Sequence, residues 1–100
     1  MAKRNPHCKL SVVKTLVASG QVRATATAFQ GALSLGVTDL AGICSVVLAL
    51  ERADFFKSMT THADHRIWQD VYHGKTLQGD GVYVKLTVLD DVLIVSFKEL

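Results

Sequence analysis

The hydrophobic pattern changes its period halfway along the chain, and this change restricts the fold to a few classes. Between residues 10 and 50, apolar side chains recur every three or four positions, which is typical of helices. From residue 82 to residue 89 they alternate with other side chains, and a second β-rich run, VLIVSFKE, follows Asp90-Asp91. Helices followed by paired strands predict an α+β fold, with N-terminal helices packed on a C-terminal antiparallel β-sheet.

Three helices are predicted in the first half, each from a capping residue and a stop signal. Glycine just after the last periodic residue ends the first two, and the third is apolar on almost every side, so we expect it to be buried. The helices are expected to run from a Leu10-Ser11 staple and cap to a stop at Gly20, from about Thr27 to Leu35 with a stop at Gly36, and from Thr38 or Asp39 through Leu50.

The second half predicts a hairpin with Asp90-Asp91 as its two-residue loop. Two more strands are expected, over residues 55–59 and 67–73. Counting outward from the loop predicts the cross-strand pairs Leu89 with Val92, Thr87 with Ile94, Lys85 with Ser96, and Tyr83 with Lys98. The face expected to be buried consists of Val82, Val84, Leu86, Val88, Leu93, Val95 and Phe97.

The other hairpin face is polar at its open end, where Tyr83, Lys85, Ser96 and Lys98 lie. A solvated sheet face, with lysine stems covering apolar neighbours, is the simple interpretation. An anion site with a proton donor is the functional one. Lys57 and Gln69 would strengthen the second interpretation if their strands belong to the same sheet, which periodicity does not decide.

Length and charge limit the domain count and the partners. The 100 residues predict one domain covering residues 1–100. The formal net charge is +2, but the first 50 residues hold five basic side chains against one acidic side chain, which gives +4. This excess suits an anionic partner, and it also fits a solvated surface without one.

The location of the protein is predicted from its cysteines and its N-terminal residues. Cys8 and Cys44 match no zinc spacing and indicate two free thiols. The first ten residues contain no apolar stretch of a signal peptide, and the run from Ile43 to Leu50 is too short to cross a membrane. We expect a cytoplasmic protein without contact to a membrane.

Residues 58–75 hold a dense group of reactive side chains. His62 and His65 have the spacing of metal ligands, but no second cluster accompanies them, so we expect no metal. No nucleophile elbow or phosphate-binding glycine loop is present. Trp68 and Tyr72 are expected either to pack in the core or to stack on bases. Arg66, His73 and Lys75 are the candidates in this stretch for contacts with a nucleic acid.

Five blocks in order resemble the MqsR toxins, the motility quorum-sensing regulator family. They are KRNPH, FFKSMTT, DHRIWQDVY, VYVKLTV and DVLIVSFKE, and the similarity covers essentially the whole chain. The connection HGKTLQGDG departs most from the family pattern. The resemblance implies a fold like that of the RelE-type ribonucleases and a type II toxin-antitoxin system. It also implies a sequence-selective mRNA endonuclease that prefers a GC-containing triplet and is neutralised by a zinc- and DNA-binding antitoxin.

The same resemblance implies a catalytic set, Lys57, Gln69, Tyr83 and Lys98, that needs no cofactor. One lysine would stabilise the pentacoordinate phosphorane, the other would share acid and base work with Tyr83, and Gln69 would position the phosphate or a base. Which lysine has which role stays open. The side chains expected to contact RNA are Arg66, His73, Lys75 and Lys85.

Two other functions would fit the same residues. A non-catalytic module could bind RNA or the ribosome with these basic and aromatic groups and form no product. A protein-interaction subunit could instead regulate transcription through its partner. The chain shows no helix-turn-helix signature with a basic recognition helix, which disfavours direct reading of DNA.

Overall fold

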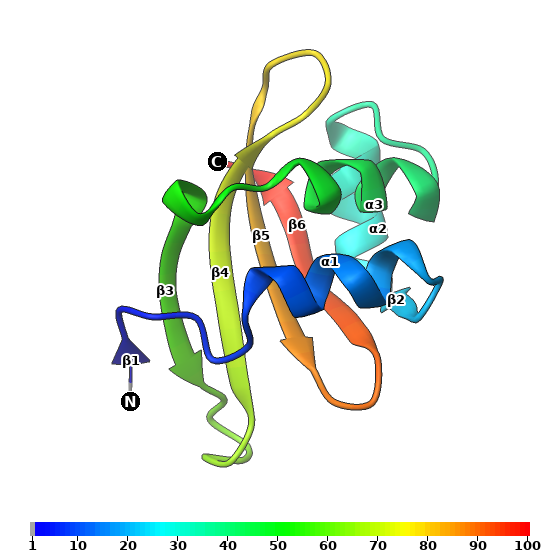
Figure 1. Cartoon of the computed structure of the whole chain (residues 1–100). Coiled ribbons are helices and arrows are strands. Elements are labelled where there is room, and N and C mark those ends of the chain that lie inside the picture. Colours follow the sequence, from blue (N-terminus) through cyan, green and yellow to red (C-terminus); the bar gives the residue numbers. More distant parts are fainter. Residues whose placement is uncertain (1) are drawn as a thin grey trace.

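The elements follow one another as the sequence predicts, with helices before the main strands. The computed structural model describes residues 2–100, and Figure 1 shows its arrangement. The predicted α+β class is confirmed, and so are the strands expected near 55–59 and 67–73. The elements are β1 Ala2–Lys3, α1 Leu10–Ala18, β2 Val22–Ala24, α2 Ala26–Ser34, α3 Leu40–Ala49, the 3-10 turn η1 Arg52–Asp54, β3 Phe55–Thr60, β4 Trp68–Lys75, β5 Gly81–Val88 and β6 Val92–Glu99.

Helix α1 begins one residue before the predicted cap. Ser11 was the expected N-cap, but the cap position is Lys9, whose side chain makes no capping hydrogen bond. The prediction is wrong because Leu10 itself is buried in the core and belongs to the first turn. The predicted end is confirmed. Gly20 has a φ of 82°, and the amides of Gly20 and Gln21 donate to the carbonyls of Val17 and Leu16, which forms a Schellman motif.

Helices α2 and α3 begin at residues whose side chains accept backbone hydrogen bonds. The Thr25 hydroxyl accepts from the amide of Ala28, and Asp39 accepts from the amide of Gly42 at 2.8 Å. Asp39, and not Thr38, is therefore the cap of α3. The helix is buried through Ile43, Val46 and Val47, but not on all sides as predicted, since Leu48 is exposed.

The sheet has six strands in the order β1-β3-β4-β5-β6-β2. The pairs from β3 to β6 are antiparallel, as predicted. Neither edge strand was predicted, because the two are only two and three residues long. β2 runs parallel to β6, so the sheet is mixed at this edge.

A bulge in β6 divides the hairpin register into two parts. At the open end, Lys85 pairs with Ser96 and Tyr83 with Lys98, as predicted. Near the turn the predicted pairs are wrong, because the loop has three residues, Leu89 to Asp91. Val95 is the extra residue that separates the two registers.

The bulge also changes which side chains of β6 are buried. Val92, Ile94 and Phe97 are buried, whereas Leu93 and Val95, both expected in the core, are only half-buried. On β5 the predicted face is confirmed at Val82, Val84 and Leu86, which are all fully buried, while Val88 is partly buried and packs against the core.

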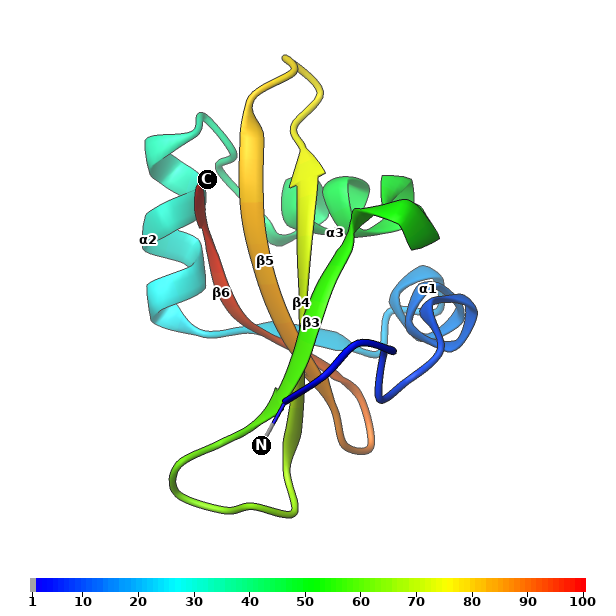
Figure 2. The ribbon, with the colours of Figure 1, turned by 90° about the vertical axis from the view of Figure 1, so that its left-hand side faces the viewer.

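Two helices cover one side of the sheet, and the third covers an edge. Seen along the sheet in Figure 2, α1 and α3 lie on one side, which we call the covered face, and α2 lies across the β6 edge, where its Ala28 and Ala32 join the same core. α2 comes so close to β6 that a Cβ on Gly31 would overlap the backbone carbonyl oxygen of Phe97. The side opposite the covered face has no helix over β3 and β4.

Candidate functional site

Seven polar side chains share the side of the sheet that faces away from α1 and α3. Because successive residues of a strand point to opposite sides, the register places these seven opposite the buried face that holds Tyr72 and Val84. We call this surface the lysine face. It consists of Lys57, Gln69, His73, Lys75, Tyr83, Lys85 and Lys98.

One row of paired residues crosses four strands, from Lys57 through Val71 and Lys85 to Ser96. Val71 has 0% exposure although it is not part of the main core cluster. The neighbouring side chains in this row therefore shield it, which is how lysine stems commonly cover apolar surface. Lys57 and Lys85 are half-buried, so the row combines positive charge with partial exclusion of water.

A second row crosses β4, β5 and β6. His73 pairs with Tyr83, and Tyr83 pairs with Lys98. The Nζ atom of Lys98 lies 4.9 Å from the centre of the Tyr83 ring. The hairpin thus brings a phenol ring and an ammonium group together, as its predicted register implied. The two groups together can donate protons and stabilise an anion.

Lys57 is positioned at the β3 edge by an irregular strand. The register of β3 shifts between Phe55 and Lys57, and the exposed Phe56 ring stacks on His73 with centroids 4.3 Å apart. The Nζ atom of Lys57 lies 5.5 Å from the Phe56 ring centre. This aromatic group was not among the predicted site residues. The Phe55-Phe56 pair is the signal for it, because in a strand one of two adjacent aromatics faces outward.

Gln69 belongs to the same face but lies apart from the hairpin pair. It pairs with Met59 on β3, one row beyond Val71 and on the opposite side of that row from His73. Strand spacing puts its Cα about 8 Å from that of Lys57 and about 17 Å from that of Lys98. Gln69 can therefore act with Lys57 on one group, but not with Lys98 on the same phosphate.

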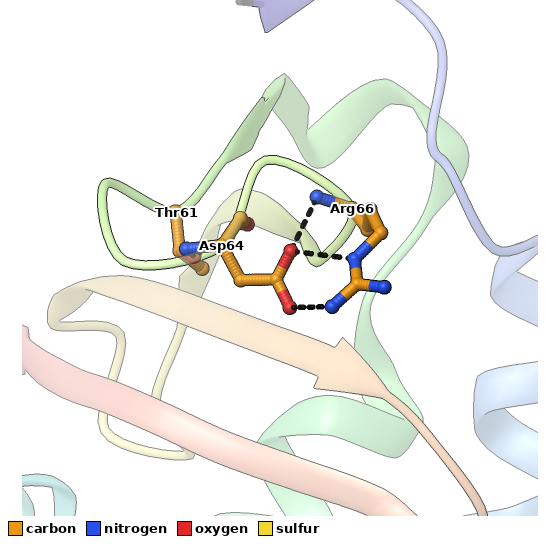
Figure 3. A network of polar contacts seen from close by, with 3 residues as sticks. All are labelled: Thr61, Asp64 and Arg66. Atoms are coloured by element: carbon orange, nitrogen blue, oxygen red, sulfur yellow. Dashed lines mark hydrogen bonds and ion pairs between the residues drawn. The ribbon is translucent and has the colours of Figure 1, made fainter.

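Three of the four predicted RNA contacts lie on the lysine face. Lys85 occupies its central row, His73 stacks on Phe56, and Lys75 is exposed at the end of β4. Arg66 lies in the loop between β3 and β4, off the sheet (Figure 3). Its guanidinium donates to both carboxylate oxygens of Asp64, at 3.1 and 3.2 Å, and these bonds hold the pKa of Asp64 below its ordinary value.

The other reactive groups of residues 58–75 have structural roles. Asp70 is buried and accepts hydrogen bonds from the amides of His7 and Cys8, so it anchors the N-terminal segment. Trp68 stacks on His7 at 5.4 Å, and Tyr72 is a fully buried core residue. His62 and His65 are exposed in the loop. No three His, Cys, Asp or Glu side chains within residues 2–100 come together as a metal site would require.

The lysine face is electropositive. The paired positions that form it hold four lysines and no carboxylate. The two ion pairs formed by described residues, Arg23 with Asp91 and Arg66 with Asp64, both lie outside it. This arrangement is suited to a phosphate backbone. Within the described chain, no helix has the length and hydropathy to cross a membrane.

Two comparisons with known proteins assign the chain to a family. Residues 5–99 match the family model described as "Motility quorum-sensing regulator, toxin of MqsA". The chain is also 56% identical over 99 residues to the mRNA interferase toxin MqsR of Escherichia coli strain K12, covering 99% of each chain. By both its family match and its similarity to this relative, the chain belongs to the motility quorum-sensing regulator toxins.

Proposed function

We propose that this protein is a toxin that cleaves mRNA internally and works in the cytoplasm. The observation that carries the proposal is the Tyr83–Lys98 pair on a lysine face without carboxylates. The name of the 56% identical relative, mRNA interferase toxin, supports the same activity. The proposed substrate is single-stranded mRNA, cut at a GC-containing triplet.

The proposed reaction is attack of the ribose 2′-oxygen on the adjacent phosphorus with departure of the 5′-oxygen. It needs a base for the 2′-hydroxyl proton, positive charge for the phosphorane, and an acid for the leaving oxygen. Tyr83 and Lys98 are close enough to act on one phosphate. Lys57 lies in the adjoining row, with its Cα about 12 Å from that of Tyr83 by strand spacing. The products would be a 2′,3′-cyclic phosphate and a free 5′-hydroxyl.

Gln69 is proposed to contact a neighbouring nucleotide. Its distance from Lys98 favours a role in holding a base over a role at the cleaved phosphate, since an amide can both donate to and accept from a base edge. His73 and Phe56 form an aromatic platform beside Tyr83, on which a base could stack. Lys75 and Lys85 would bind the backbone, and Arg66 would contribute once RNA competes with Asp64.

A partner is proposed as well. The family model is described as a toxin of MqsA, so an antitoxin would neutralise this chain in the cell. We propose that it binds zinc and DNA, as the resemblance implies, and that the toxin itself needs no metal, since lysine, tyrosine and glutamine supply the groups required for cleavage.

The test is cleavage of a labelled RNA oligonucleotide containing GC triplets. Lys98→Ala should reduce the cleavage rate by a factor of about 10² to 10⁴, as expected for loss of one acid, base or charge-stabilising group. Lys14→Ala, on α1, is the matched control and should cleave normally. EDTA should leave the rate unchanged.

Undiminished cleavage by Lys98→Ala would refute the assignment of this lysine. If the parent protein binds the oligonucleotide but forms no product, it is a non-catalytic RNA-binding module. If it neither binds nor cleaves, the remaining function is that of a protein-interaction subunit acting through its partner.

A further inference from the structure

A large cleft lies on the covered face, away from the lysine face. It has a volume of about 1040 Å³ and lies between residues 4–6, the first turn of α1 and η1. Figure 1 shows these three segments around the upper parts of β3 and β4. Its lining includes Arg4, Lys9, Ser11, Arg52, Phe55 and Tyr72, and we call it the arginine cleft. The proposed RNA cleavage uses none of these residues.

The charges around the arginine cleft are all positive. Arg4, Lys9 and Arg52 are exposed at its rim, and no Asp or Glu lines it. None of the three forms an ion pair with a described residue. Three unpaired cations around one cavity favour an anionic ligand.

The first turn of α1 adds backbone donors to the same cleft. Lys9, Leu10 and Ser11 all line it. The helix has no side-chain cap and no acidic residue in its first turn, and the amides of Leu10 and Ser11 have no hydrogen-bond acceptor among residues 2–100. Unsatisfied amides at a helix N-terminus attract phosphate groups.

A buried hydroxyl points to a ligand independently of the helix. Tyr72 lines the cleft and has 0% exposure, yet its hydroxyl has no partner within the described residues. Such an orphan is unfavourable unless something binds it. Burial, with a smaller contribution from Asp70, raises the pKa of Tyr72, so the hydroxyl keeps its proton. No hydrogen bond joins this hydroxyl to the Asp70 carboxylate, whose two oxygens accept the amides of His7 and Cys8.

We propose that the arginine cleft is a second binding site, separate from the lysine face, for the phosphate group of a mononucleotide. The phosphate would sit at the first turn of α1 among Arg4, Lys9 and Arg52. The cleft is much larger than a phosphate ion, and Phe55 with its apolar neighbours offers a wall for the ribose and base. A nucleotide fits this combination of one anionic and one apolar end.

The test is an NMR titration of the full chain, which follows the amides of Leu10 and Ser11 and does not depend on RNA cleavage. We expect both amides to shift saturably with inorganic phosphate and with AMP, AMP binding more tightly, and not to shift with adenosine. No saturable shift with phosphate or AMP would overturn the proposal. A shift with hexaglutamate but not with phosphate would also overturn it, in favour of an acidic protein partner.

Variants identify the groups responsible. The double variant Lys9→Gln/Arg52→Gln should weaken AMP binding at least tenfold and leave RNA cleavage at the parent rate, while Lys14→Gln on the same helix should bind AMP normally. Tyr72→Phe should weaken AMP binding by about tenfold, the size expected for a lost hydrogen bond to a charged group. Unchanged AMP binding in the double variant would refute the site. Loss of RNA cleavage in the double variant would show that the arginine cleft is not separate from the lysine face.

Discussion

The two faces of the sheet use the same strands for opposite purposes. On β5, Val82, Val84 and Leu86 are fully buried beneath the helices, while the alternating Tyr83 and Lys85 belong to the lysine face. Burial of one set fixes the backbone, and the backbone then fixes the position of the other set. The proposed site residues are therefore placed by neighbours on the other face, which cannot touch RNA bound to the lysine face. Substitution of a buried strand residue should therefore lower stability, and substitution of its neighbour on the lysine face should lower function instead.

The strongest test of this separation compares adjacent residues of β5. Leu86→Ala should lower the free energy of unfolding by about 2–5 kcal/mol because it leaves a cavity in the core. Lys85→Ala should lower it by no more than about 1 kcal/mol, because only the stem that covers Val71 is lost, but it should weaken RNA binding. Chemical denaturation and RNA titration of both variants measure the two effects. Equal loss of stability in the two variants would show that the two faces of the sheet do not have separate roles.

The next test concerns α2, which lies at the edge where the two faces meet. Gly31→Ala should destabilise the protein by about 1–3 kcal/mol, because the new Cβ would overlap the carbonyl oxygen of Phe97 and push α2 away from β6. Thermal unfolding should show the loss, and cleavage should fall too, since Lys98 follows Phe97. Ser34→Ala, at an exposed position of the same helix, is the control. A stable and fully active Gly31→Ala protein would mean that the lysine face does not depend on α2.

A smaller effect of opposite sign is expected on the covered face. The hydroxyls of Tyr72 and Ser58 are buried without partners among the described residues. Tyr72→Phe should raise the free energy of unfolding by about 1 kcal/mol in the absence of ligand, because it removes an unsatisfied polar group and leaves the ring in place. Chemical denaturation in phosphate-free buffer measures this. A destabilised variant would show that the hydroxyl already has a partner in solution.

The smallest effect concerns the ion pair that joins β2 to the hairpin turn. Arg23 donates to Asp91 at 2.6 and 3.1 Å, and this bond lowers the pKa of Asp91 below its ordinary value. Its stabilisation is therefore complete above the ordinary aspartate pKa of about 3.9 and is lost as the pH falls through the lowered value. Asp91→Asn should be slightly less stable than the parent at pH 7 and equal to it in strong acid.

Asp90→Asn is the matched control for that measurement. Asp90 lies in the same turn and forms no ion pair within the described chain. Its substitution should leave the pH dependence of unfolding unchanged. A stability difference for Asp91→Asn that persists at low pH would mean that the ion pair is not its cause.

Alternation predicted the strands well and the register only in part. In the run Val92-Leu93-Ile94-Val95, every position is apolar, so either phase could face the core. The predicted two-residue loop was one residue too short, and the bulge at Val95 compensates for it. The Tyr83–Lys98 pair was therefore predicted correctly, although the loop length and the bulge were not. Packing against the helices decides which of the two alternating sets of side chains is buried. The sequence of one strand does not contain that information.

Other parts of the site depend on contacts between distant segments. Gln69 could be assigned to a strand, but its distance from Lys98 follows from the order of strands in the sheet. Arg66 was a reasonable RNA contact from its charge alone, and only the loop conformation shows that Asp64 holds it. The short strands β1 and β2 have too few residues to show a period. These features arise from tertiary structure, which local pattern does not encode.

The parallel pairing of β2 with β6 has a consequence for the order in which a ribosome makes this protein. Thr25 donates to the carbonyl of Val95, 70 residues later in the chain, and Lys98 belongs to the same late strand. A nascent chain without residues 92–99 lacks both the partner of β2 and one half of the proposed catalytic pair. Contacts so distant in sequence form late in folding. An mRNA-cutting toxin built in this way would stay inactive until synthesis has passed its last strand, which spares the message that encodes it while it is being read.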